Sequence, residues 1–229
     1  MPLNPGSAEG KAPNQLCIVC GEAQAQFFAS VEGLDYRRCE ACQATFLKPA
    51  HRLSAEQTYA RYCRHQNHPE DPHYRQFLSK LAGPVLKRLP PGSKGLDYGC
   101  GPGPALACML REAGHRMSLF DLYFFPDRRL LDARYDFITC TETAEHFHRP
   151  AEEFARFDQM LRPGGWLAIM TTFQTNDDRF ASWHYRRDPT HVVFYRGATL
   201  RYIARQFGWS CEIPVSDVAL MQKPASRSG

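Results

Sequence analysis

The stretch Gly95-Leu96-Asp97-Tyr98-Gly99-Cys100-Gly101-Pro102-Gly103-Pro104 decides the fold of this chain. It is typical of a buried strand that runs into a glycine-rich turn, and a helix is expected directly after it. Glycines at 99, 101 and 103 let the backbone turn sharply and approach a ligand without a side chain in the way. Because the N-terminus of the following helix faces such a ligand, the stretch predicts a nucleotide-like cofactor.

Two residues of this stretch favour S-adenosylmethionine over NAD. A dinucleotide fingerprint has its third glycine at position 104, where this chain has Pro104, which removes a backbone N–H from the first helical turn. Asp97 would repel a diphosphate, but it is placed to hold the ammonium of an amino-acid moiety. Asp121 ends the next predicted strand, about 20 residues downstream, where a carboxylate can accept hydrogen bonds from both ribose hydroxyls.

At these residues the chain resembles the class I S-adenosylmethionine-dependent methyltransferases. The matching segments lie in the family's order along the chain: 96–103, 120–121, 135–147 and 161–171. The resemblance covers roughly residues 70–222 and is strongest for a short branch that carries Glu-x-x-Glu-His and a later Asp-Pro-Thr-His, here 142–146 and 188–191. The residues predicted to bind the cofactor are Asp97, Tyr98, Gly99, Cys100, Gly101, Gly103, Asp121, Leu122 and Thr141.

The alternation of elements over 93–229 predicts an α/β fold, a Rossmann-like doubly wound and mostly parallel sheet with helices on both faces. Strands are expected at 94–98, 116–121, 136–140, 166–172, 209–214 and 218–222, and helices at 104–113, 150–161 and 197–207. A helical linker or cap is expected at 51–92. Its first helix opens with a capping box at Ser54 and Gln57, and its second, amphipathic helix ends before Pro90. Residues 1–14 are expected to be disordered.

A separate pattern at 15–50 predicts a small N-terminal zinc ribbon. Two Cys-x-x-Cys pairs are separated by eighteen residues, the spacing of a four-cysteine zinc site: Cys17, Cys20, Cys39 and Cys42. A tight turn at Gly21 and a hairpin over 27–36 fit this reading. Zinc with four thiolates is structural because no position stays open for water, and a redox pair of dithiols is the alternative. The segment is too short to bury its own core, so we expect it to need the metal to fold.

One departure from the family concerns the adenine pocket. Only fourteen residues separate Asp121 from Asp136, too few for the helix and strand that usually intervene. The pocket must therefore be built differently, and the aromatic run Tyr123-Phe124-Phe125 is a candidate apolar wall for the adenine ring. Core packing is the alternative role for these rings.

The candidate catalytic residues are Glu142, Glu145 and His146, with His191 on a later loop. Methyl transfer is an in-line displacement, so the protein must align the nucleophile and remove or weaken its proton. Spacing of i, i+3 and i+4 puts the first three residues on one face if their segment is helical. The alternative to a joint catalytic role is a structural hydrogen-bonded pair of Glu145 and His146, with His146 or His191 acting alone as general base.

The Glu-x-x-Glu-His motif also resembles that of the small-RNA 3′-terminal 2′-O-methyltransferases and the ubiquinone-pathway O-methyltransferases. In the RNA enzymes these residues and a distal histidine bind a divalent ion. The resemblance therefore implies Mg²⁺ or Mn²⁺ on the same residues here, with His191 as the fourth ligand, where the ion would polarise a substrate hydroxyl.

Residues 177–195 lie between the fifth strand and the next helix and are a candidate substrate lid. They combine aromatic and basic side chains, which suit a planar or anionic acceptor such as a nucleobase, a quinone-like ring or a nucleotide-linked sugar. Packing between domains is the alternative. The side chains concerned are Phe180, Trp183, His184, Tyr185, Arg186 and Arg187.

Length and composition limit the partners and the location that can be expected for this chain. The chain has 229 residues and a net charge of +4 with mixed signs, which gives no strong attraction to nucleic acid or to anionic membranes. Residues 1–14 lack the features of a signal peptide, and no stretch approaches the roughly 18 apolar residues of a membrane span. Nine cysteines without a secretory signal fit a reducing compartment, so a cytoplasmic location is expected.

The predicted function is thus S-adenosylmethionine-dependent methyl transfer to a hydroxyl or carbon of a small molecule. Two alternatives stay open. One is methylation of an RNA 2′-oxygen or base with divalent-metal assistance. The other is a catalytically silent S-adenosylmethionine-binding scaffold whose zinc ribbon docks a partner protein.

Overall fold

Strand β5 (Lys94–Tyr98) is next to one edge of a six-stranded sheet in the computed structural model, which describes residues 15–64 and 68–226. The strand order is β10-β11-β8-β7-β5-β6, with β6 (Arg116–Phe120), β7 (Tyr135–Thr141), β8 (Leu161–Met170), β10 (Ser210–Val215) and β11 (Val218–Gln222). The strands from β6 to β8 pair in parallel, while β11 and β10 are antiparallel. The predicted mostly parallel sheet is confirmed, and 1–14, predicted to be disordered, lies outside the described residues.

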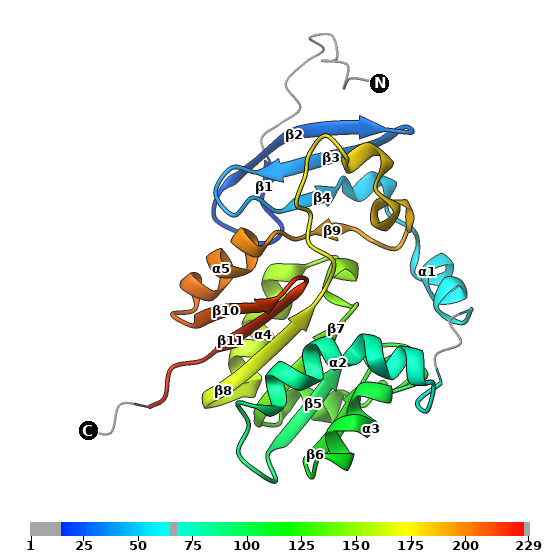
Figure 1. Cartoon of the computed structure of the whole chain (residues 1–229). Helices are drawn as coiled ribbons and strands as arrows, with labels where there is room; N and C mark the ends of the chain where they lie inside the picture. Colours follow the sequence, from blue (N-terminus) through cyan, green and yellow to red (C-terminus); the bar gives the residue numbers. More distant parts are fainter. Residues whose placement is uncertain (1–14, 65–67, 227–229) are drawn as a thin grey trace.

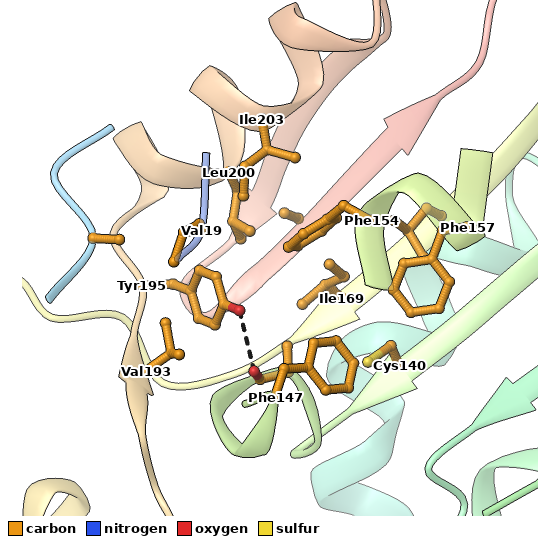
Figure 2. Packing of buried hydrophobic residues seen from close by; sticks show 14 of the residues in the cluster. Val19, Cys140, Phe147, Phe154, Phe157, Ile169, Val193, Tyr195, Leu200 and Ile203 are labelled. Carbon is orange, nitrogen blue, oxygen red and sulfur yellow. Dashed lines mark hydrogen bonds between the residues drawn. The ribbon is translucent and has the colours of Figure 1, made fainter. Parts of the chain in front are cut away.

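Helices cover both faces of this sheet (Figure 1), as predicted. Helices α2 (Pro72–Leu86) and α3 (Ala105–Glu112) pack on one face, and α4 (Pro150–Met160) and α5 (Gly197–Gln206) pack on the other. Side chains of β8 alternate between the two cores, since Ala168 contributes to the first and Ile169 to the second. Figure 2 shows the second core, where α4, α5 and the sheet bring their apolar side chains together.

A second, smaller sheet is built from the N-terminal segment and one distant strand. Its order is β1-β2-β3-β4-β9, all antiparallel, with β1 (Gln15–Leu16), β2 (Gln24–Val31), β3 (Leu34–Cys39), β4 (Thr45–Leu47) and β9 (Val193–Phe194). The hairpin of β2 and β3 is as expected. Strand β9 was not anticipated, and it ties the four-cysteine segment directly to the C-terminal half of the chain (Figure 1).

Residues 177–195 pack between the two sheets. Phe180, in η4 (Phe180–Ser182), is 1% exposed and makes edge-to-face contacts with Phe28, Tyr36 and Phe194. Arg186, in η5 (His184–Arg187), is buried and donates to the Tyr36 hydroxyl at 3.4 Å and to a Glu32 carboxylate oxygen at 2.9 Å. Phe180 and Arg186 therefore pack between the two sheets, which was the alternative to a role in a substrate lid.

The linker region is helical, as expected. Helix α1 (Ala55–Tyr62) opens with the predicted capping box, in which the Ser54 hydroxyl accepts from the Gln57 N–H at 3.2 Å and the Gln57 side chain accepts from the Ser54 N–H at 3.0 Å. Shorter 3₁₀ turns are η1 (Pro49–His51), η2 (Arg128–Asp132) and η3 (Ala144–His146). Within 15–64 and 68–226, no helix is long and apolar enough to cross a membrane.

Candidate functional site

A cavity of about 880 Å³ opens at the carboxyl ends of β5 and β7. From β5 the chain first adds β6 on one side and then β7 on the other, so the strand order reverses at this point. Such a reversal leaves a crevice in which doubly wound proteins bind their ligands. The glycine-rich loop, the end of β7, α1, α2 and α4 all contribute to the lining.

The glycine loop has the backbone geometry that its sequence requires. Gly99 and Gly101 have φ values of 76° and 62°, a region that favours glycine. A Cβ on Gly99 would lie 2.2 Å from Cγ2 of Thr143, whose hydroxyl donates to the Gly99 carbonyl at 3.0 Å. A Cβ on Gly101 would meet open space. The loop is thus held from behind by Thr143 and leaves its Gly101 side free for a ligand.

Asp121 holds this loop and the turn that follows β6. Its Oδ2 accepts from the Gly101 N–H at 3.0 Å, and its Oδ1 accepts from the N–H groups of Tyr123 and Phe124 at 2.9 and 3.1 Å. A carboxylate offers about four lone-pair sites, so roughly one remains for a ribose hydroxyl. Tyr123 and Phe124 line the cavity, where an apolar wall was expected, and Tyr59 of α1 packs against them.

Seven of the nine residues predicted to bind the cofactor line the cavity, and Asp97 and Gly103 do not. Asp97 is 3% exposed, and its Oδ1 accepts from the Thr139 hydroxyl at 2.9 Å. Burial raises the pKa of this carboxyl to about 6. The structure therefore places Asp97 inside the sheet, because its side chain turns toward β7. The seven lining residues are Tyr98, Gly99, Cys100, Gly101, Asp121, Leu122 and Thr141.

All four candidate catalytic residues line the same cavity, although not on a helix face. The segment forms only the 3₁₀ turn η3, and Glu142 precedes it with φ of 47°, a strained value for a residue with a side chain. Glu142, Glu145 and His146 therefore do not share one face of an α-helix, because their segment is not helical throughout. Ligand atoms of Glu145, His146 and His191 nevertheless lie within 4.8 Å of one another, in a group that does not include Glu142.

The two histidines have one ring nitrogen fixed by the backbone. His146 Nδ1 lies 3.0 Å from the Thr190 carbonyl, and His191 Nδ1 lies 2.7 Å from the Tyr185 carbonyl. A carbonyl only accepts, so each Nδ1 carries the proton and each Nε2 of a neutral ring is left as an acceptor. Burial lowers the pKa of His191, which favours this neutral form.

Tyr185, which the sequence analysis assigned to a candidate lid, contacts the catalytic candidates instead. Its hydroxyl donates to Glu145 Oε1 at 2.6 Å, lies 3.5 Å from Glu142 Oε2, and lies 3.0 Å from the Thr171 hydroxyl. Glu145 is fully buried, and its Oε2 has no hydrogen-bond partner among the described residues. Burial and the neighbouring Glu145 carboxylate raise the pKa of Glu142 to about 9.

The cap and α4 supply lining residues that sequence reasoning missed: Leu53, Ala55, Thr58, Tyr62, Tyr74, Phe77, Glu152, Glu153 and Arg156. A partial signal was available, since Tyr59 and Tyr62 recur at helical spacing on a helix with no buried residue. Tyr98 is hydrogen-bonded to two of the α4 residues: its hydroxyl donates to Glu153 Oε2 at 2.5 Å and accepts from Arg156 at 3.2 Å. The Thr141 hydroxyl is buried in the cavity lining without a partner among the described residues.

The four predicted zinc ligands come together at the edge of the smaller sheet. All four are buried, and the Sγ atoms of Cys17 and Cys42 and of Cys20 and Cys39 lie 3.6 and 3.7 Å apart. These distances exclude disulfides and agree with the edge of about 3.8 Å of a tetrahedron with Zn–S bonds of about 2.3 Å. Gly21 and Gln43, each following a Cys-x-x-Cys pair, have φ of 72° and 62°. The two turns are thus alike, and the donor set fits zinc.

Comparison with known proteins identifies a family. Residues 67–212 match the profile of a family described as a methyltransferase domain. A ubiquinone biosynthesis O-methyltransferase of Leptothrix cholodnii is 44% identical over 39 residues, which are 17% of this chain and 17% of that relative. Its similarity is thus confined to a short segment.

Two solved structures resemble this one at low identity. The 1,6-didemethyltoxoflavin-N1-methyltransferase of Burkholderia thailandensis, solved with 1,6-didemethyltoxoflavin and S-adenosylhomocysteine, is 19% identical, with a TM-score of 0.48 over 80% of this chain and 96% of that one. An O-methyltransferase family protein from the same organism is 16% identical, with a TM-score of 0.49 over 78% and 66% of the two chains. Both scores are low, so neither structure indicates what this chain acts on.

Proposed function

Because this chain belongs to the methyltransferase domain family, we propose that it transfers the methyl group of S-adenosylmethionine to a hydroxyl or carbon of a small molecule. The observation that carries the proposal is the meeting of the glycine loop and the Glu145, His146 and His191 cluster in one cavity of about 880 Å³. A cavity of this size suits a cofactor together with a small acceptor.

The cofactor would be held by the glycine loop, Asp121 and Thr141. Gly101 leaves open space in front of its backbone, Asp121 retains a free lone pair, and the buried Thr141 hydroxyl lacks a partner among the described residues. S-adenosylmethionine supplies an electrophilic methyl group on a sulfonium. Tyr123 and Phe124 offer an apolar wall for its adenine ring.

His146 and His191 would accept the proton of the acceptor. Each has a proton on Nδ1 and a free lone pair on Nε2, so each can act as a general base. The buried Glu145 carboxylate lies 3.9 Å from His146 Nε2 and stabilises the imidazolium that forms when that ring takes a proton. Tyr185 orients Glu145 through its hydroxyl and His191 through its carbonyl.

Two measurements test this function. Calorimetric titration with S-adenosylhomocysteine should show one site per chain, and Asp121→Ala should weaken it at least tenfold, as expected for loss of a hydrogen-bonded carboxylate. Tritium transfer from labelled S-adenosylmethionine is then measured with pooled small metabolites and, separately, with total RNA. Counts in the metabolite pool that fall with His191→Asn support the proposal, counts in RNA alone favour the RNA alternative, and cofactor binding without transfer favours the scaffold.

A second candidate is metal-assisted transfer at the same cluster. It is favoured by the 4.8 Å grouping of two imidazole nitrogens with a carboxylate, a donor set that suits Mn²⁺ better than Mg²⁺. Titration of protein with its zinc retained against Mn²⁺, compared with Glu142→Ala and His191→Ala, tests it. Binding that is lost in His191→Ala supports the ion, and the absence of binding, or binding that neither change affects, rejects it.

We also propose that the four thiolates bind a structural zinc ion. The ligands are closed around one point and leave no position for water. Metal analysis of protein purified without chelator should give one zinc per chain.

A further inference from the structure

A second, smaller cavity lies at the amino ends of β5 and β6. It has a volume of about 530 Å³ and is lined by Lys94, Arg111, His115, Arg116, Met117 and Ser118. Lys94 begins β5 and Arg116 begins β6, whereas the methyltransferase cavity is at the carboxyl ends of these strands. Five residues of β-strand span roughly 13 Å, so the two cavities are separate sites.

The charges of this cavity are unbalanced. Lys94 and Arg116 are direct partners in the parallel pairing of β5 and β6, an unfavourable arrangement of like charges that the cation–π contact of Lys94 Nζ with the Tyr135 ring, 5.0 Å from its centre, relieves only in part. Among the described residues, no carboxylate lies within 4.0 Å of the cationic groups of Lys94, Arg111 or Arg116, whereas nearby Arg162 forms an ion pair with Asp136. Within the same described ranges, Arg111 and Arg116 donate to the backbone carbonyls of Met117 and Gly92.

The Asp136 carboxylate, beside this cavity, already accepts hydrogen bonds from two other groups. Asp136 accepts from the Lys94 backbone N–H at 2.7 Å with Oδ2 and from Arg162 at 2.7 Å with Oδ1. Arg162 is its ion-pair partner, and the charge of Arg116 also acts on Asp136, so this carboxylate offsets only part of the positive charge of the cavity.

His115 provides an independent observation. It lines the cavity and is 7% exposed, and its Nδ1 is buried without a hydrogen-bond partner among the described residues. A buried ring nitrogen without a partner is costly, and an added acceptor or donor would remove that cost. Ser118, two residues along β6 from Arg116, also lines the cavity, and its hydroxyl is hydrogen-bonded to Tyr135.

We propose that this basic cavity, defined by Lys94, Arg111, His115, Arg116 and Ser118, binds a phosphate group. Two guanidinium groups and an ammonium match the charge of a phosphate, and the unpartnered ring nitrogen of His115 matches one of its oxygens. The site is independent of the methyl-transfer chemistry, because it shares no lining residue with the larger cavity. The phosphate belongs either to a free phosphorylated compound or to a nucleic-acid backbone.

Calorimetric titration of the zinc-loaded full chain tests the proposal, with pyrophosphate and a single-stranded RNA hexamer as separate probes. We expect saturable binding of at least one probe. Arg116→Gln and Lys94→Gln should each weaken it about tenfold or more, as expected for loss of one charge-assisted contact. Arg129→Gln, which alters an exposed arginine paired with Asp127 elsewhere, is the matched control and should leave binding unchanged.

The two probes distinguish the sources of the phosphate. Pyrophosphate binding without RNA binding indicates a free phosphorylated ligand, and tighter RNA binding that both changes weaken indicates a nucleic-acid backbone. Urea unfolding of each variant confirms that it is folded, and Arg116→Lys, which keeps the charge, should restore most of the affinity. No saturable heat with either probe, or binding that neither Arg116→Gln nor Lys94→Gln weakens, overturns the proposal.

Discussion

The two sheets of this protein are stabilised in different ways. On its α2 and α3 face, the six-stranded sheet has an apolar core of its own, formed by side chains of these helices and of the strands. The smaller sheet has large buried side chains such as Tyr36 and Phe46, but these belong to the core that α4 and α5 also form, and its last strand, β9, comes from the other half of the chain. One face of the larger sheet thus has an independent core, whereas the smaller sheet shares its core with the other face.

The attachment passes directly beside the candidate site. The Leu47 N–H at the end of β4 donates to the Val192 carbonyl at 2.9 Å, and the Val192 N–H donates to the Glu145 carbonyl at 2.8 Å. Val192 is the neighbour of His191. The smaller sheet therefore helps to fix the position of both a candidate base and its carboxylate, although it lines none of the cavity itself.

Removing one thiol of the four-cysteine cluster should have the largest effect on methyl transfer. We expect Cys39→Ser to lose the zinc, unfold the smaller sheet and reduce methyl transfer by about 100-fold or more, because His191 loses its support. Metal analysis and the transfer assay measure the two consequences together. Cys63→Ser, at an exposed cysteine outside the cluster, should change neither. Full activity of a zinc-free protein would show that the sheets are not coupled.

A change confined to the larger sheet should leave the zinc in place. In Gly99→Ala the new Cβ would lie 2.2 Å from Thr143, a clash that costs about 1–3 kcal/mol and weakens S-adenosylhomocysteine binding about 10- to 100-fold. Gly114→Ala has the same left-handed backbone requirement but meets open space, so it controls for strain. Equal affinities of the two variants in calorimetry would contradict the role given to Thr143.

Tyr185→Phe examines the region between the sheets. Loss of the hydroxyl leaves the buried Glu145 carboxylate without its donor, and we expect a cost of about 1–3 kcal/mol in urea unfolding together with slower methyl transfer. In Tyr195→Phe the lost hydroxyl donated to the Ala144 carbonyl, which also accepts from the Phe147 N–H, so a smaller cost is expected (Figure 2). A larger cost for Tyr195→Phe would argue against the dependence of the buried Glu145 carboxylate on the Tyr185 hydroxyl.

The smallest effect concerns the pH dependence of the larger sheet. The pKa of Asp97 is raised to about 6 in the folded protein from an ordinary value of 3.8, so its contribution to stability is complete below pH 3.8 and is lost as the pH rises through 6. Between pH 5 and pH 7 this loss amounts to about 1 kcal/mol. Asp97→Asn, which keeps the shape, should remove that part of the decline in urea unfolding at several pH values. An unchanged slope would show that Asp97 is ionised without penalty.

Local patterns were sufficient to predict much of the larger sheet. Strands β5 and β11 have the bounds that were expected, and the capping box at Ser54 begins α1 as predicted. Each of these depends on residues close together in the sequence. The start of strand β8 could not be predicted from local patterns. The strand begins at Leu161 and runs through Pro163 and Gly164, two residues that are unfavourable in strands, and its register against β7 shifts in this part.

Long-range contacts were beyond the reach of the sequence. Strand β9 has only two residues, too few for any periodicity, and its partner in β4 is encoded far away. The same limit applies to the site. The motif residues from Tyr98 to His146 were identified because their spacing is local, whereas the contributions of Tyr62, Tyr74 and Tyr185 depend on how distant helices and turns pack.

The pairing of β4 with β9 also sets an order of events during synthesis. Strand β4 ends at Leu47 and β9 begins at Val193, about 145 residues later. At about 5–20 residues per second, the ribosome delivers the missing strand roughly 7–30 seconds after the hairpin and its thiols have emerged. For that interval the edge of β4 is unpaired, which exposes the N-terminal segment to thiol oxidation and edge-to-edge aggregation, and capture of the proposed zinc ion during translation would protect it.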